Sequence, residues 1–168
     1  FHELLLSIDE LENTNIIFTK SNSDTDGRII NQLINEYTSK NLDKSLGIAS
    51  LGQLNYLSTL QCIDFIIGNS SSGLLEAPSF KIGSINIGDR QKGRIKAESV
   101  IDCLPDKKDI EKAIKKIYSN EFQKKLKNMN NPYENRDGDS YASQKIVKVL
   151  KTVPLDDILK KVFFDVKF

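Results

Sequence analysis

Residues 63–94 have the sequence IDFIIGNSSSGLLEAPSFKIGSINIGDRQKGR, around which the other elements of the chain are arranged. It begins with IDFII over residues 63–67, an apolar run that is typical of a buried strand. Six small residues, GNSSSG over 68–73, follow it, and LLEA over 74–77 indicates the first turn of a helix with a serine cap. The stretch therefore predicts a strand, a tight turn and a helix N-terminus in direct succession.

This succession favours an anion site in the turn. Unpaired amides and the positive end of the helix dipole would point at a ligand there, and the hydroxyls of Ser70 and Ser71 would add donors. Glu76 would repel a phosphate, but its place one turn further along suits a pair of sugar hydroxyls. An ordinary β–α connection with a serine cap has the same sequence, so GNSSSG alone leaves both interpretations open.

A second strand, SINIG over 84–88, runs directly into the polar sequence DRQKGR over 89–94. In a parallel sheet both loops open at the carboxyl edge, where ligands of open α/β sheets bind. Arg90 and Arg94 would there neutralise a diphosphate, because the guanidinium fork matches phosphate oxygens.

The rest of the chain alternates between helical and strand patterns. Apolar residues at helical spacing predict helices over 1–11, 28–40, 51–62, 106–128 and 140–152. Further strands are expected at 15–19, 45–50 and 100–103, the last at an edge. This alternation predicts an α/β fold with a doubly wound parallel sheet. We expect one domain over 1–153 and a separate amphipathic tail over 154–168.

Composition restricts the classes of function. The chain has 168 residues, of which 39% are hydrophobic and 28% charged, as expected for a soluble globular protein. A net charge of +1 provides no general attraction for nucleic acid or an anionic membrane, so we expect neither as a partner. Cys62 and Cys103 lie in or beside apolar segments, which favours buried free thiols in the cytoplasm. Because the sequence starts at Phe1 inside a helical pattern, we expect it to be a domain of a longer protein.

The loop 20–27 contains a partial calcium-binding pattern. Asn22, Asp24, Asp26 and Gly27 imitate the first half of an EF-hand loop, but Leu33 occupies the position that needs a bidentate glutamate. An aspartate-capped turn therefore explains the loop better than a calcium site. One histidine and two scattered cysteines offer no metal site either.

Three segments together resemble a known family. IIGNSSSGLLEAPSF, INIGDRQKGR and ESVI are similar to the C-terminal half of the hydrolysing UDP-N-acetylglucosamine 2-epimerases of the sialic-acid pathway, and the resemblance covers roughly residues 1–150. It departs from the family at Lys81–Gly83, where the family usually has Gly-x-Pro. It also departs in NPYENRDGD over 131–139, where extra residues interrupt the family's NPYGDG.

The resemblance implies a Rossmann-like domain, the C-terminal half of a two-domain GT-B-type fold, with its tail packed toward the missing N-terminal domain. It implies a UDP-sugar as ligand, no cofactor, and a homo-oligomeric full-length enzyme. The implied UDP-binding residues are Asn22, Tyr56, Asn69, Ser70, Ser71, Gly73, Glu76, Arg90 and Arg94. Tyr56 would lie beside the uracil base, although its neighbours at helical spacing indicate a core tyrosine equally well.

The same resemblance assigns no catalytic residue to this chain. The family's acid–base groups lie mainly on the other domain, and His2, the sole histidine, does not match the family's His-Pro motif. Two other functions stay open. One is a hydrolysing 2-epimerase acting on a UDP-diacetamido sugar, and the other is a non-catalytic α/β nucleotide-binding module. A receiver-like signalling domain is disfavoured, because Asp64 begins its strand instead of ending it.

Overall fold

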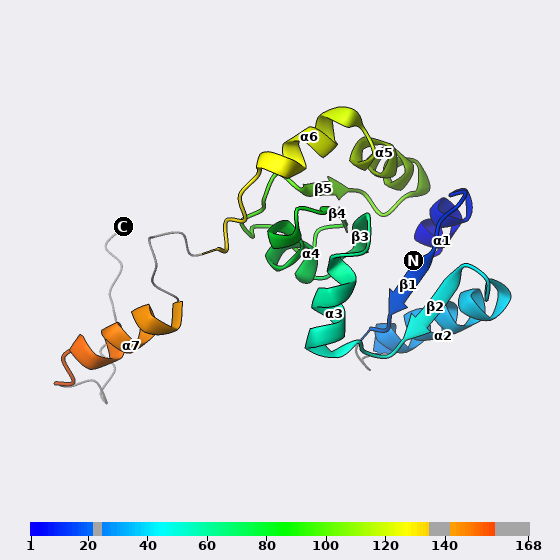
Figure 1. Ribbon diagram of the computed structural model, residues 1–168. Helices are drawn as coiled ribbons and strands as arrows, with labels where there is room; N and C mark the ends of the chain where they lie inside the picture. The colour runs from blue at the N-terminus through cyan, green and yellow to red at the C-terminus, as the bar shows by residue number, and fades with distance from the viewer. Residues whose placement is uncertain (22–24, 135–141, 157–168) are drawn as a thin grey trace, which may run out of the picture. The chain divides into compact units, whose positions relative to one another are not determined.

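A computed structural model describes residues 1–21, 25–134 and 142–156 of the chain (Figure 1). It divides into two compact units, Phe1–Pro132 and Tyr133–Phe168. The first unit holds every strand that the structure describes. The second contains helix α7, Ala142–Thr152, near the predicted helix over 140–152. The expected boundary between 153 and 154 stays a prediction.

The elements of the first unit alternate along the chain as the sequence pattern predicts. In order they are α1 His2–Asp9, β1 Ile16–Thr19, α2 Thr25–Lys40, β2 Ser45–Ile48, α3 Gly52–Leu60, β3 Phe65–Gly68, α4 Ser72–Leu75, the 3₁₀ helix η1 Ala77–Phe80, β4 Gly83–Ile87, β5 Val100–Cys103, α5 Lys107–Ile117 and α6 Asn120–Asn128.

The strands pair in parallel, which confirms the predicted α/β class. β1 pairs with β2, and a second ladder has the order β3-β4-β5, which places β5 at an edge as expected. Among the described residues no ladder joins the two sheets.

Helices cover both faces of the three-stranded sheet. Neighbouring residues of β4 show this, because successive side chains of a strand point to opposite faces. A Cβ added to Gly83 would lie 2.6 Å from Ile117 of α5, whereas the Ser84 hydroxyl donates to the Gly73 carbonyl of α4 at 2.7 Å. Figure 1 shows α5 and α6 on one side of this sheet and α4 on the other. The sheet is therefore doubly wound.

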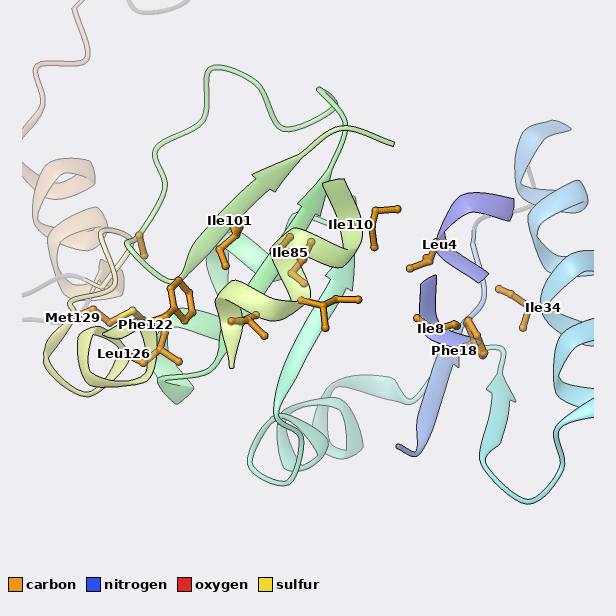
Figure 2. Packing of buried hydrophobic residues seen from close by; sticks show 14 of the residues in the cluster. Leu4, Ile8, Phe18, Ile34, Ile85, Ile101, Ile110, Phe122, Leu126 and Met129 are labelled. Carbon is orange, nitrogen blue, oxygen red and sulfur yellow. The ribbon is translucent and has the colours of Figure 1, made fainter. Parts of the chain in front are cut away.

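The buried core joins α1 to the three-stranded sheet through α5. α1 packs against α5, and Figure 2 shows Leu4 and Ile110 at this contact. The backbone N–H of Lys107, the first residue of α5, also donates to the Glu3 carboxylate at 3.1 Å. Phe122 and Leu126 of α6 extend the same core (Figure 2).

Two expectations, one about a helix and one about a cysteine, are wrong. The predicted helix 106–128 is two helices, because Ser119 adopts an extended conformation and its hydroxyl accepts from the Phe122 N–H at 3.3 Å, capping α6. Cys62 is exposed and not buried, because α3 ends before it and the turn to β3 carries it to the surface, while Cys103 is half-buried. None of the helices described is long and apolar enough to cross a membrane.

Candidate functional site

The two polar loops begin side by side at the carboxyl edge of the sheet. The last residue of β3, Gly68, is in register with Asn86 of β4, so the chain leaves both strands at the same level. Gly88 follows β4 with a φ of 77°, a left-handed conformation that favours glycine. We call residues 68–73 the serine loop and residues 88–94 the arginine loop. The sequence correctly predicts that these loops adjoin.

The serine loop uses several of its own amides. The N–H of Ser72 donates to the Ser70 hydroxyl at 3.3 Å, and those of Gly73 and Leu74 donate to the carbonyls of Ser70 and Ser71. The expectation of unpaired amides at the start of a helix is wrong for these groups, because α4 is a single turn that closes on the loop itself. Hydroxyls remain as donors, and that of Ser71 caps nothing in α4.

Gly73 has a packing reason to be glycine. A Cβ at this position would lie 3.2 Å from the Ser84 hydroxyl oxygen, and this hydroxyl already donates to the Gly73 carbonyl. The absent side chain therefore lets α4 rest directly on β4. Any contact of Gly73 with a ligand stays a prediction.

Tyr56 reaches the serine loop from α3. The side chain is half-buried, and its hydroxyl forms a hydrogen bond with the Ser72 hydroxyl. The pKa of Tyr56 is raised, mainly by burial. The hydrogen bond with Ser72 lowers this pKa, but the nearby charge of Glu76 raises it. Tyr56 therefore lies close to Glu76 and the serine loop, and its contact with a base stays a prediction.

Glu76 follows α4 and has an unusual environment. Its Oε2 atom is buried, yet no group among the described residues donates a hydrogen bond to it. A buried carboxylate oxygen without a donor is costly, so the position is suited to a hydroxyl that a ligand or another chain segment supplies.

A buried asparagine supports this segment from behind. Asn131, the first residue of the NPY sequence, donates through Nδ2 to the Leu75 carbonyl at 2.8 Å and to the Ser79 hydroxyl at 2.7 Å. It thereby connects α4 and η1 with the end of the first unit. Residues 135–139 of the predicted NPYENRDGD loop lie outside the described residues.

The arginine loop exposes both predicted arginines. The guanidinium groups of Arg90 and Arg94 have no hydrogen-bond or ion-pair partner in the described part of the chain. Between them Gln91 is buried, and its Nε2 donates to the Asn69 carbonyl at 2.8 Å. Reasoning from the sequence missed Gln91, because nothing in the run DRQKGR marks one residue as buried.

A hollow of about 350 Å³ lies beside the arginine loop. Arg94 lines it and Arg90 does not; the other lining residues are Gly88, Asp89, Lys92, Gly93, Lys96 and Asp102. Partial burial raises the pKa of Asp102, but hydrogen bonds from Lys96 and Asn86 outweigh this effect and hold the pKa below its usual value. The sequence did not predict this hollow.

The structure thus gathers most of the predicted residues into one group. The serine loop contains Asn69, Ser70, Ser71 and Gly73, Tyr56 bonds to it through Ser72, and Glu76 follows it directly after α4. Arg90 and Arg94 lie on the adjoining arginine loop. Asn22 lies outside the described residues. In the described ranges, no three His, Cys, Asp or Glu residues cluster as a metal ion would require.

These features define a Rossmann-like α/β protein with polar loops at the carboxyl edge of a parallel sheet. Residues 1–151 match the sequence profile of UDP-N-acetylglucosamine 2-epimerase, and the chain belongs to this family.

Two curated relatives and one solved structure illustrate the similarity. The chain is 44% identical over 163 residues to GDP/UDP-N,N'-diacetylbacillosamine 2-epimerase (hydrolyzing) of Campylobacter jejuni, covering 96% of this chain and 41% of that protein. It is 40% identical over 132 residues to polysialic acid biosynthesis protein P7 of Escherichia coli, covering 78% of this chain and 33% of that protein. A crystal structure of a UDP-N-acetylglucosamine 2-epimerase homologue from Listeria monocytogenes superimposes with a TM-score of 0.62 at 16% identity, covering 99% of this chain and 42% of that one. The chain therefore spans about two fifths or less of these proteins.

Proposed function

We propose that this chain is the UDP-binding, C-terminal half of a two-domain hydrolysing UDP-sugar 2-epimerase. The observation that carries the proposal is the buried Glu76 Oε2, which lacks a donor among the described residues and lies in the group formed by Tyr56 and the serine loop. Membership of the 2-epimerase family and similarity to a relative named as hydrolysing support it.

Each group has a role that follows from its chemistry. Glu76 accepts hydrogen bonds from the ribose hydroxyls, and Tyr56 lies against the base. The Ser71 hydroxyl and the guanidinium of Arg90 donate to the diphosphate oxygens. A carboxylate beside the ribose and cations beside the phosphates would fix the direction in which the nucleotide lies.

The reaction proposed for the whole enzyme proceeds in two steps. Loss of the C2 proton and cleavage of the C1–oxygen bond release UDP and leave an unsaturated sugar. Addition of water, with OH to C1 and H to C2, then inverts the configuration at C2. This chain contributes to the first step, because Arg90 and Ser71 stabilise the negative charge that grows on the departing diphosphate.

Two sugars are candidates for the substrate. The family description favours UDP-N-acetylglucosamine, with N-acetylmannosamine as the released sugar. The Campylobacter jejuni relative favours a UDP-diacetamido sugar, since its name specifies N,N'-diacetylbacillosamine. The residues described here address the nucleotide, so the choice between the sugars belongs to the rest of the enzyme.

Calorimetry with UDP and with pyrophosphate tests the proposal. The wild-type chain should bind UDP weakly, and Ser71→Ala and Arg90→Ala should each weaken it by about 1–3 kcal/mol through loss of a charge-assisted hydrogen bond. Glu76→Gln should weaken UDP binding but leave pyrophosphate binding unchanged or improved, because it removes a sugar contact and relieves repulsion.

Lys124→Ala serves as the matched control, since it removes an exposed cation from α6. It should bind UDP as the wild type does. If Ser71→Ala and Arg90→Ala also matched the wild type, the diphosphate would not bind at these loops. Equal losses of UDP and pyrophosphate in Glu76→Gln would mean that Glu76 supports the loop and does not contact the ribose.

A further inference from the structure

Gln91 is the one buried residue in an exposed turn. Its side chain and backbone are 3% exposed, whereas the other five residues of 89–94 are exposed. The turn is closed locally by two backbone hydrogen bonds, from Lys92 to Asp89 at 2.8 Å and from Arg94 to Gln91 at 3.3 Å. Gly93 completes it with a φ of 81°. Burial of one polar side chain in such a turn requires a specific partner.

That partner is the backbone of the serine loop. Gln91 Nε2 donates to the carbonyl of Asn69 at 2.8 Å, across a gap of 22 residues in sequence. The other amide atom, Oε1, is buried and has no donor among the described residues. Burying the Gln91 amide with its oxygen unpaired lowers the stability of the fold. We therefore look for a function of the hydrogen bond that the amide nitrogen makes.

Gln91 lies between the two arginines of the arginine loop, so its hydrogen bond to Asn69 affects where both of them lie. Arg90 precedes Gln91 directly and Arg94 follows three residues later, so fixing Gln91 fixes the base of both arginine side chains. Neither guanidinium has a partner of its own in the part of the chain that the structure describes. Ser70 and Ser71 follow Asn69 in the same way on the other loop. One hydrogen bond thus joins the backbone beside the two serines to the backbone beside the two arginines.

We propose that Gln91 is a positioning residue that holds the arginine loop to the serine loop, so that both sets of donors meet the same diphosphate. The role for a diphosphate rests on the proposed function, whereas the coupling between the loops does not. In this proposal the buried Gln91 acts through the two loops and not by contacting the diphosphate.

The first test needs no ligand. Gln91→Met keeps the length of the side chain and removes the donor, and Gln53→Met makes the same change at an exposed position of α3. Hydrogen–deuterium exchange should become faster in both loops of Gln91→Met and stay unchanged in Gln53→Met, with β3 and β4 protected in each. Faster exchange in one loop only, or in neither, overturns the coupling. If Gln91→Met fails to fold, Gln91→Ala repeats the test, because alanine also removes the donor and adds no strain from a longer side chain.

The second test separates positioning from general support of the fold. Gln91→Met should weaken UDP binding roughly tenfold, the value of about one hydrogen bond, and leave uridine binding unchanged. In an Arg90→Ala, Arg94→Ala background, the same substitution should cause no further loss. Equal losses for UDP and uridine, or a full tenfold loss in the double-alanine background, overturn the role in positioning. A wild-type chain that binds no UDP would refute the proposed function, while hydrogen exchange would still decide the coupling.

Discussion

Lys81 occupies a backbone position whose conformation favours glycine. It ends η1 in a left-handed conformation with a φ of 59°, which costs a residue with a Cβ about 1–2 kcal/mol and costs glycine little. The resembled family usually has glycine here. Lys81 offsets part of the cost through Nζ, which donates to the Met129 carbonyl. Lys81 therefore adopts a conformation that glycine would adopt at lower cost.

The two cysteines differ in a way that alkylation can measure. Cys62 is exposed, whereas burial, together with the nearby charges of Asp109, Asp102 and Asp106, raises the pKa of Cys103 to about 11. Because the thiolate is the nucleophile, iodoacetamide at pH 8 should modify Cys62 well before Cys103. Mass spectrometry of Cys62→Ser and Cys103→Ser variants gives each rate separately.

The raised pKa of Cys103 also has a defined effect on stability. Because the thiol ionises more readily in the unfolded chain, its contribution is complete below pH 9 and is lost as the pH rises through about 11. The alkaline fall in the unfolding midpoint should therefore be smaller in Cys103→Ser than in the wild type.

For the alkylation experiment, equal rates for the two thiols would contradict the assigned environments.

At the scale of elements, periodicity predicts the existence of most helices and strands but not their ends. The apolar stripe over 106–128 continues through Ser119, so nothing in the pattern reveals the break between α5 and α6. The cap of α6 is a local hydrogen bond of Ser119, and serine is equally common on the polar face of a helix. The stripe itself was predicted correctly, since Ile110 and Phe122 on either side of the break are buried.

The contact between β4 and α5 predicts a large effect of one methyl group. A Cβ at Gly83 would lie 2.6 Å from both Cδ1 and Cγ1 of Ile117 and 3.1 Å from the Phe122 ring. Gly83→Ala should therefore lower the free energy of unfolding by about 1–3 kcal/mol through overpacking. Urea denaturation of Gly83→Ala, Ile117→Ala and the double variant provides the measurement. The double variant should lose less free energy of unfolding than the two single variants lose together. A loss equal to their sum would show that the two groups do not clash.

The hydrogen bonds to the Asp102 carboxylate predict that the free energy of unfolding decreases at acidic pH. Lys96 Nζ lies 2.7 Å from both carboxylate oxygens, and Asn86 donates to one of them at 2.7 Å. Because the pKa of Asp102 is lowered in the folded state, this stabilisation is present above the ordinary carboxyl pKa and is lost as the pH falls through the folded value. Asp102→Asn should cost up to about 1 kcal/mol at pH 7, since the ion pair is partly exposed. In urea titrations the difference should shrink as the pH falls below the ordinary carboxyl pKa and through the lower folded value, and a constant difference would contradict the role of the charge.

In the molecule as a whole, the sequence predicts that the two loops of the site meet, but not the side-chain contacts that hold them. Parallel strands bring the ends of β3 and β4 to one edge by topology alone, so the meeting of the serine and arginine loops followed from the order of elements. Contacts across long gaps did not follow, because they depend on how helices rest on the sheet. The bond of Tyr56 with Ser72 and that of Gln91 with Asn69 are of this kind.

The described site has groups for binding but a limited set for acid–base chemistry. His2, the sole histidine, is exposed on α1, while the serine and arginine loops present hydroxyls and guanidinium groups. Stabilisation of a leaving group contributes a few kcal/mol, whereas enzymes lower barriers by about 8–23 kcal/mol in total. This chain, which spans 41% of its Campylobacter jejuni relative, therefore offers only part of what the proposed reaction would need.

The last prediction is that residues 1–168 alone bind UDP but release none from a UDP-sugar. Joining this chain to the part of the Campylobacter jejuni relative that it does not match should restore release of UDP. A coupled assay for UDP, run with UDP-N,N'-diacetylbacillosamine because the relative's name specifies that sugar, measures the rate. In the joined protein Arg90→Ala should lower kcat as well as affinity, because the charge on the diphosphate grows as the C1 bond breaks. Lys124→Ala should leave both unchanged, and appreciable turnover by residues 1–168 alone would refute this division of labour.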